Sequence, residues 1–149
     1  MFKHILVPTE GSRLAAKGVK SGVRLAKALG ARVTGVYVIE PYLPPMVPEA
    51  AVMATAALDP REYEKAAKAQ AAKALATLER EARQAGVRCT RQVVTAPQPW
   101  QGILKLARAK RCDAIVIASH GRGGLGGLIL GSETQRVLAQ SRIPVLVVR

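Results

Sequence analysis

Aromatic residues are scarce in this chain of 149 residues, since Phe, Trp and Tyr together make up 3% of it. A core must therefore be built from Ala, Val, Leu and Ile, which suits helices packed on a parallel sheet. The same scarcity leaves almost no side chains that could stack on nucleic-acid bases. We expect the single tryptophan, Trp100, to anchor a helix against the sheet.

Cysteine is also rare, with only Cys89 and Cys112 present. These residues show neither the CxxC spacing nor the neighbouring histidines of a metal site, and two cysteines do not make a disulfide scaffold. We expect both to be small buried residues of the core.

Long apolar runs are absent, and no run approaches the roughly 18 residues that a membrane-spanning helix needs. The N-terminal segment MFKHILVPTEG contains one Lys and breaks at Pro8, which is unlike a secretory signal peptide. The sequence therefore predicts a cytoplasmic protein that has no membrane partner.

Acidic residues are few, with 10 Asp and Glu against 23 Lys and Arg, which gives a formal net charge of +13. Such an excess favours polyanionic partners without choosing among nucleotide, nucleic acid and membrane. The basic residues are spread along the chain rather than gathered in one tail, which is typical of a solvated surface. Because no dense basic patch is interleaved with aromatic residues, nucleic acid is the less favoured partner.

Hydrophobic periodicity alternates between the strand and helix patterns along the chain. Strands are expected over 2–8, 32–40, 87–95, 113–118 and 143–149, and helices over 14–29, 61–86, 100–110 and 132–141. Gly30 and Gly86 are expected to end the first two helices. This order predicts one α/β domain over 1–149, a Rossmann-like, five-stranded, mainly parallel sheet with helices on both faces.

Residues 41–60 contain five prolines, together with Met46 and Met53, and cannot be regular structure throughout. The segment is long for a loop in a compact domain, so it is interpreted as an insertion or lid. The two methionines suit either an adenine pocket or a cover over the core.

A glycine-rich stretch, residues 119–131, precedes the helix that begins at Ser132. Glycines let a phosphate oxygen approach backbone N–H groups, and the first turn of a helix is a general anion site. His120 and Arg122 can add a donor or a charge, although His120 can equally brace the loop. The spacing of Gly121 and its neighbours formally matches GxGxxG, but the helix starts too late and no acidic residue follows. A P-loop is excluded because no GK[ST] follows the glycines.

The segments ILVPTEGS near the start and IPVLVVR at the end, with this loop between them, resemble the universal stress protein family along the whole chain. In the ATP-binding branch of that family, the motif is Gly, two residues, Gly, nine residues, Gly, and Ser or Thr. Gly121, Gly131 and Ser132 match its second half, whereas Ala118 takes the place of the first glycine. By position Glu10 matches an Asp that approaches the ribose, and Val38 matches a residue that lies on the adenine.

The resemblance implies a homodimer formed through the strand over 143–149 that binds ATP and acts as a ligand-responsive regulator in stress response. The residues that the resemblance and the loop place around the nucleotide are Pro8, Thr9, Glu10, Val38, Ala118, His120, Gly121, Arg122, Gly131, Ser132, Glu133 and Thr134. The Cβ of Ala118 would be added where the ligand passes close to the backbone. Glu133 favours the helix dipole but would repel a phosphate.

Two alternatives stay open at this point. One is a slow ATPase or autophosphorylating protein, which requires a metal such as Mg²⁺ and for which Glu10 is the carboxylate at hand. The other is a nucleotide-free interaction dimer that binds another protein or macromolecule. Glu10 can also serve only to cap the first helix near Ser12.

Overall fold

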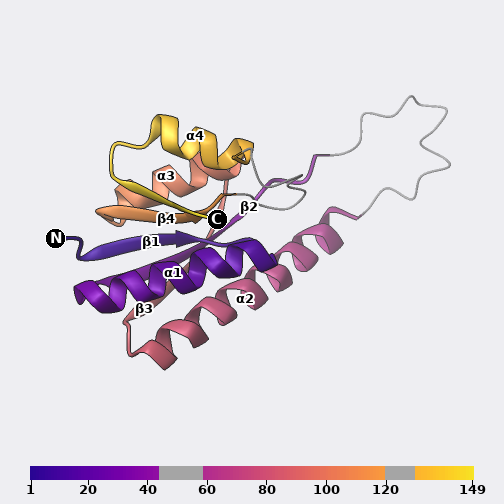
Figure 1. Ribbon diagram of the computed structural model, residues 1–149. Helices are drawn as coiled ribbons and strands as arrows, with labels where there is room; N and C mark the ends of the chain where they lie inside the picture. The colour runs from indigo at the N-terminus through magenta and orange to yellow at the C-terminus, as the bar shows by residue number, and fades with distance from the viewer. Residues whose placement is uncertain (44–58, 120–129) are drawn as a thin grey trace, which may run out of the picture.

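The computed structural model describes residues 1–43, 59–119 and 130–149. Within these residues lies a five-stranded sheet in the order β3-β2-β1-β4-β5, in which each pair of neighbours is parallel (Figure 1). The strands are β1 (His4–Pro8), β2 (Arg32–Ile39), β3 (Cys89–Thr95), β4 (Ala114–Ala118) and β5 (Val145–Val148). The helices are α1 (Arg13–Leu29), α2 (Pro60–Ala85), α3 (Pro99–Ala109) and α4 (Ser132–Gln140). The predicted α/β fold and its order of elements are confirmed.

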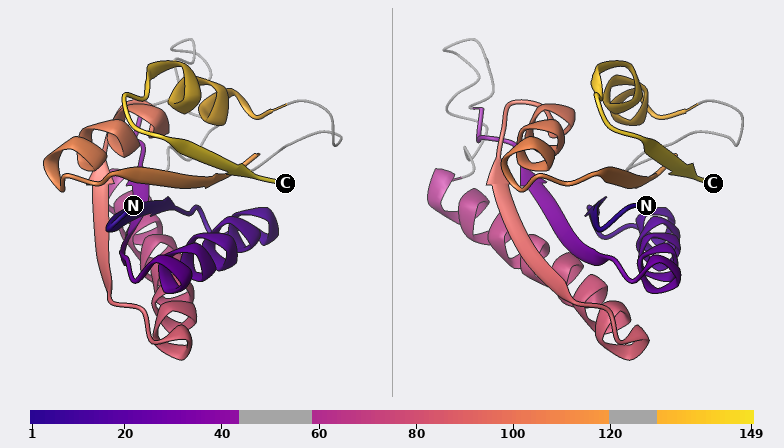
Figure 2. Two further views of the ribbon diagram at one scale, coloured as in Figure 1. Left: turned by 60° about the vertical axis from the view of Figure 1, so that its left-hand side comes forward. Right: turned by 90° about the vertical axis from the view of Figure 1, so that its left-hand side faces the viewer.

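The helices cover both faces of the sheet, as the views in Figure 2 show. Helices α1 and α2 lie on one face, and α3 and α4 lie on the other. Side chains that point to opposite faces form separate cores, with Val7 and Leu78 in the core on the α1/α2 side. Leu6 and Val137 belong to the core on the α3/α4 side. A parallel sheet buried on both sides explains why its central strands are continuous apolar runs.

The ends of α1 and α2 follow the capping rules that their sequences predict. The Ser12 hydroxyl accepts a hydrogen bond of 3.0 Å from the Ala15 N–H, so Ser12 caps α1. Gly30 and Gly86 follow the last residues of α1 and α2 with φ of 64° and 71°, in the left-handed region that favours glycine. Both predicted helix stops are confirmed.

Helix α1 packs unusually close to β1 and β4 because two of its inward positions are glycine. A Cβ placed on Gly22 would lie 2.7 Å from Cγ2 of Val7, and one on Gly18 would lie 3.0 Å from the backbone nitrogen of Ala118. Side chains at these two positions would force α1 away from the sheet.

The two cysteines differ in burial. Cys112 is buried, and its burial raises the pKa of its thiol to about 11. Cys89 is only partly buried on β3, an edge strand. The expectation of two buried thiols is therefore confirmed for Cys112 and wrong for Cys89, because a residue on an edge strand has a neighbouring strand on one side only.

In the part of the chain that the structure describes, no helix combines the length and the apolar character needed to cross a bilayer. Trp100 packs against the core on the α3/α4 side, so its predicted role as an anchor is confirmed. Most of the lid predicted over 41–60, including Met46 and Met53, lies outside the described residues.

A chain of polar side chains lies at the start of β1 and joins β1, β2 and β3; His4 and Thr34 in it are buried, and Arg32 and Thr90 at its ends are exposed. The Arg32 guanidinium donates to Nδ1 of His4 at 3.1 Å, so Nδ1 is the acceptor and Nε2 carries the proton. Nε2 of His4 then donates to the Thr34 hydroxyl at 2.7 Å, and this hydroxyl lies 2.9 Å from that of Thr90. Two causes lower the pKa of His4: burial, which is the larger, and the positive charge of Arg32. The fold therefore favours the neutral imidazole.

We expect this chain to make stability depend on pH. The unfolded state takes up a proton at the ordinary His pKa of 6.5, whereas the folded state resists it, so the free energy of unfolding falls as the pH drops below that value. Urea denaturation at several pH values measures the free energy of unfolding. From neutral to mildly acidic pH, this free energy should fall further for the wild type than for His4→Gln. His120 is present in both proteins, so its titration cancels in the difference. Parallel losses in the two proteins would contradict the prediction.

Candidate functional site

The candidate site lies where β1, β2 and β4 end, at the carboxyl edge of the sheet. Ligands of open parallel sheets bind beyond this edge. β1 lies between β2 and β4, so residues that follow these three strands come together. The structure places Pro8, Val38 and Ala118 at or near the ends of these strands, as predicted. His120, Gly121 and Arg122 lie outside the described residues.

The turn between β1 and α1 is fixed by hydrogen bonds to its backbone. Thr9 is buried, and its N–H donates to the carbonyl of Val36 at 2.9 Å. Its hydroxyl accepts from the N–H of Gly11 at 3.2 Å, and Gly11 adopts a φ of 85°. Glu10 lies at this turn with Oε1 shielded from solvent. The turn therefore places Glu10 just beyond the end of β1, on a backbone that these hydrogen bonds hold.

The first turn of α4 is held directly against the end of β4. The N–H of Gly131 donates to the carbonyl of Ser119 at 2.7 Å, and the buried hydroxyl of Thr134 donates to the carbonyl of Ala118 at 2.9 Å. The N-cap residue of α4, Gly131, makes no side-chain capping bond, and no side chain of the described residues is seen to cap this helix. Ser132 is exposed. The hydroxyl of Thr134 is thus committed to the carbonyl of Ala118. Of the groups of Thr134 that were predicted to bind a phosphate, the backbone N–H remains.

The side chain of Ala118 points toward α1. Ala118 is 6% exposed, and its Cβ would lie 3.4 Å from a Cβ placed on Gly18 of α1. The methyl group therefore fills space between β4 and α1. Strand geometry directs the side chain of residue 118 to the α1 face. The expectation that this Cβ stands beside a ligand stays a prediction.

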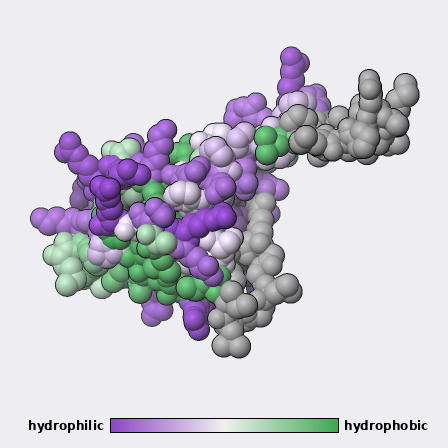
Figure 3. Space-filling model, turned by 90° about the horizontal axis from the view of Figure 1, so that it is seen from above, coloured by the Kyte–Doolittle hydropathy of each residue, from purple (hydrophilic) through white to green (hydrophobic). Residues whose placement is uncertain are grey.

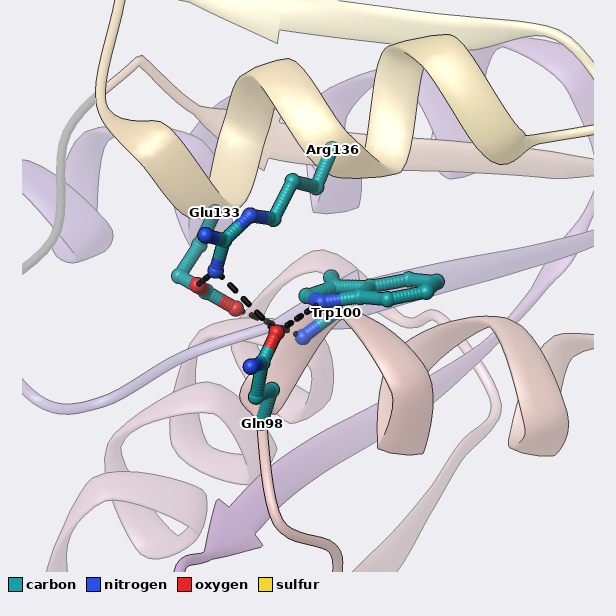
Figure 4. A network of polar contacts seen from close by, with 4 residues as sticks. All are labelled: Gln98, Trp100, Glu133 and Arg136. Atoms are coloured by element: carbon teal, nitrogen blue, oxygen red, sulfur yellow. Dashed lines mark hydrogen bonds and ion pairs between the residues drawn. The ribbon is translucent and has the colours of Figure 1, made fainter.

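The side chain of Glu133 points toward the start of α3 rather than toward the N–H groups of its own helix (Figure 4). Its Oε2 accepts from the N–H of Trp100 at 2.8 Å, and its Oε1 forms an ion pair of 3.0 Å with Arg136. Gln98, the residue before α3, makes no capping bond to that helix itself and instead accepts from the Trp100 indole and Arg136. Glu133 is thus committed to the start of α3 and is partly neutralised, which weakens the repulsion of a phosphate at α4.

Val38 serves mainly as a packing residue. It belongs to the partly buried residues of the core on the α3/α4 side. A Cβ placed on Gly102 of α3 would approach both of its methyl groups to 3.0 Å. Only the remaining exposed part of Val38 is available to an adenine.

A cavity of about 260 Å³ opens between α1 and α2, next to the β1–α1 turn. Its lining residues are Thr9, Glu10, Gly11, Ser12, Ala16, Val19, Gln70, Lys73, Ala74 and Thr77. Of the predicted site residues, it contains Thr9 and Glu10 and lacks Val38, Ala118, Gly131 and Ser132. The α2 residues were missed because Gln70, Lys73 and Thr77 border the apolar stripe of a long helix, where polar residues usually face solvent. Groups of three or more His, Cys, Asp or Glu that could hold a metal are absent from the described residues.

Comparison with known families gives one match over the full chain. The model of the Universal stress protein family matches residues 1–149. A universal stress protein of Thermus aquaticus is 34% identical over 153 aligned residues, which cover 100% of this chain and 100% of the relative.

Solved structures share the fold. A universal stress protein in complex with cAMP aligns with a TM-score of 0.73 and 23% identity, covering 99% of this chain and 97% of that one. The universal stress protein from Archaeoglobus fulgidus in complex with dAMP aligns with a TM-score of 0.66 and 16% identity, covering 100% and 98% of the two chains.

The contact between Glu133 and Trp100 predicts a measurable effect on stability. Glu133→Ala removes the acceptor that caps α3, which should lower the free energy of unfolding by about 1 kcal/mol. Glu133→Gln keeps an acceptor oxygen, so its free energy of unfolding should fall by less. Denaturation followed by the fluorescence of Trp100, the sole tryptophan, measures both. Equal stability of Glu133→Ala and the wild type would show that the cap contributes nothing.

Proposed function

Because this chain belongs to the universal stress protein family along its whole length, we propose that it binds an adenine nucleotide, with ATP as the first ligand to test. Binding rather than turnover is the proposed activity. The nucleotide would act as a regulatory ligand of a homodimer in stress response. Two solved relatives of the same fold hold adenine nucleotides, cAMP in one and dAMP in the other.

The observation that carries this proposal is the first turn of α4. Among the described residues, no side chain caps its backbone N–H groups, and hydrogen bonds from Gly131 and Thr134 hold the turn at the carboxyl edge of β4. Unpaired N–H groups together with the positive end of a helix dipole attract an anion. The exposed hydroxyl of Ser132 adds a donor beside them. This end of α4 suits the phosphates of a nucleotide.

One departure from the family motif, Ala118, and one nearby negative charge, Glu133, are compatible with such a site. The methyl group of Ala118 faces α1, so it takes no room from a ligand at the carboxyl edge. The carboxylate of Glu133 is bound to the start of α3 and to Arg136. The proposal assigns the ribose to Glu10 and the adenine to the surroundings of Pro8, Thr9 and Val38. Gly121, Arg122 and His120 would complete the phosphate side.

The homodimer is proposed through β5. This strand is at the edge of the sheet and pairs only with β4 among the described strands. Leu146 on β5 is 47% exposed. Figure 3, which looks onto the α3/α4 side, shows hydrophobic surface gathered along the border of the molecule that β5 forms. An exposed apolar edge strand invites pairing with another strand, and a twin β5 supplies one.

A charge at the start of α4 tests the phosphate site. Ser132→Asp should weaken ATP binding by about tenfold, or about 1.4 kcal/mol, because its carboxylate repels the phosphates. The same change should leave thermal stability equal or higher, because an acidic residue in the first turn suits the helix dipole. Calorimetric titration of ATP into nucleotide-free protein measures the affinity, and a thermal melt measures stability.

The matched control is Gln140→Glu, which makes the same charge change at the other end of α4. It should bind ATP as the wild type does. If ATP binds the wild type and Ser132→Asp equally well, the phosphates do not lie at α4. If no adenine nucleotide binds the wild type at millimolar concentration, the proposed function is wrong.

A substitution on β5 tests the dimer. Leu146→Glu places a charge on the exposed edge and should convert a dimer to a monomer in light scattering after gel filtration. Val93→Glu is the control, because Val93 is 49% exposed on β3, the opposite edge strand. It should leave the dimer intact. A wild-type protein that is monomeric at the concentrations tested would contradict the proposal directly.

A further inference from the structure

Helix α1 carries a row of basic side chains along its solvent-facing side, which we call the α1 basic ridge. Its members are Arg13, Lys17, Lys20, Arg24 and Lys27, all exposed. Successive members are four, three, four and three residues apart, which is the spacing of neighbours on one face of a helix. With 3.6 residues per turn, the five positions fall within about 80° of the circumference and span about 21 Å.

The ridge is opposite the buried side of α1. The buried residues Val19, Val23 and Ala26 point into the core between α1 and the sheet. The orientation of α1 is fixed by the close approach of Gly18 and Gly22 to β4 and β1. The basic side chains are therefore displayed in one direction by a helix that cannot easily turn.

No acidic residue balances the ridge within its own helix, since α1 contains five basic residues and no Asp or Glu. In the described part of the chain, the ion pairs join Glu64 to Lys68, Glu79 to Arg91 and Glu133 to Arg136, and none includes a ridge residue. Helix α2, on the same face of the sheet, interleaves four acidic with six basic residues. The lack of balancing acidic residues is thus a feature of α1 that is not shared by α2, which covers the same face of the sheet.

Small residues flank the ridge, namely Ala16, Ser21 and Ala28. They leave the basic side chains open to close contact with a large, stiff polyanion. The large hydrophobic residues that are exposed in the described structure are Met1, Leu43, Val93, Leu138 and Leu146, and none lies on α1. The ridge therefore lacks the apolar side chains with which interfacial helices enter a lipid bilayer.

We propose that the α1 basic ridge binds the phosphate backbone of double-stranded nucleic acid without reading its sequence. A row of about 21 Å extends along about six base pairs at 3.4 Å per pair, and its cations are about 5 Å apart. Lys and Arg bind phosphate oxygens whatever the base sequence. Helix α1 contains no Asn or Gln with which to contact the edges of adenine. Without aromatic side chains on the ridge, single strands gain no stacking.

This proposal differs from the expectation drawn from the sequence, which disfavoured nucleic acid because the basic residues are scattered. Five of those scattered residues lie in one row on the exposed side of α1 once the helix is folded. The proposal also stands apart from the proposed nucleotide site, because the ridge includes none of the residues assigned to it. Each can fail without the other.

The test is fluorescence anisotropy with a labelled DNA duplex of about 20 base pairs, titrated at a series of salt concentrations. Five phosphate contacts give a slope of log K against log salt of about −4.5. Lys17→Gln, Lys20→Gln and Arg24→Gln together should reduce the slope to about −1.8 and weaken binding by about tenfold or more at low salt. Glutamine is a good helix former, so α1 should remain folded.

The matched control is a triple variant of α2, in which Lys65, Lys68 and Arg83 are replaced by Gln with the same change in net charge. It should keep the slope and the affinity of the wild type. If the two triple variants lost the same affinity for the duplex, only the overall charge would matter. The proposal that the α1 basic ridge is the binding surface would then be wrong. Circular dichroism and ATP titration verify that both variants are folded, so a failure of the nucleotide site is recognised separately.

Two further probes complete the test. A single strand of the same length should bind more weakly than the duplex. Vesicles that contain anionic phosphatidylserine should bind more weakly than the duplex at equal salt. Tighter binding to the single strand, or binding to vesicles in the absence of duplex binding, would overturn the proposal and assign the ridge to a different polyanion.

Discussion

The close packing of α1 against β1 and β4 is the constraint on which the carboxyl edge depends. It exists because Gly18 and Gly22 lie four residues apart on the inward side of α1, where any side chain would meet Ala118 or Val7. The contact gives the methyl group of Ala118, which strand geometry directs toward α1, a place to pack. Since the carbonyls of Ala118 and Ser119 then accept hydrogen bonds from the first turn of α4, the position of α4 follows from the position of α1.

A second contact clears the same edge of unfavourable charge. Two helices on the α3/α4 side begin near each other, and each needs groups to satisfy the N–H groups of its first turn. Glu133 belongs to α4 but accepts a hydrogen bond from the N–H of Trp100 in α3, while no side chain of the described residues caps the N–H groups of α4. Because Ser132 at the start of α4 is exposed, water or another acceptor can satisfy these N–H groups. An anion at α4 would satisfy them, which is the physical argument that links the fold to the proposed nucleotide site.

The sequence predicted the order and type of all the described elements because each depends on local rules. Gly30 and Gly86 end their helices, Ser12 caps α1, and apolar runs form the central strands. The directions of Ala118 and Glu133 could not be predicted, since each depends on a helix that is distant in the sequence. The same reason hid the cavity between α1 and α2, to which Gln70 and Lys73 contribute across more than fifty residues of chain. The positions of His120, Gly121 and Arg122 stay predictions.

Helices α1 and α2 show that solubility alone does not explain the charge of α1. Both helices cover the same face of the sheet, and both expose one side to water. Helix α2 meets that need with acidic and basic residues in alternation, including the i, i+4 pair of Glu64 and Lys68. If hydration were the only requirement, α1 would be expected to use the same mixture, because five like charges in a row repel one another and cost stability. A helix that keeps this repulsion uncompensated, on a backbone held rigidly by two glycines, has the form of a surface whose counter-charge comes from another molecule.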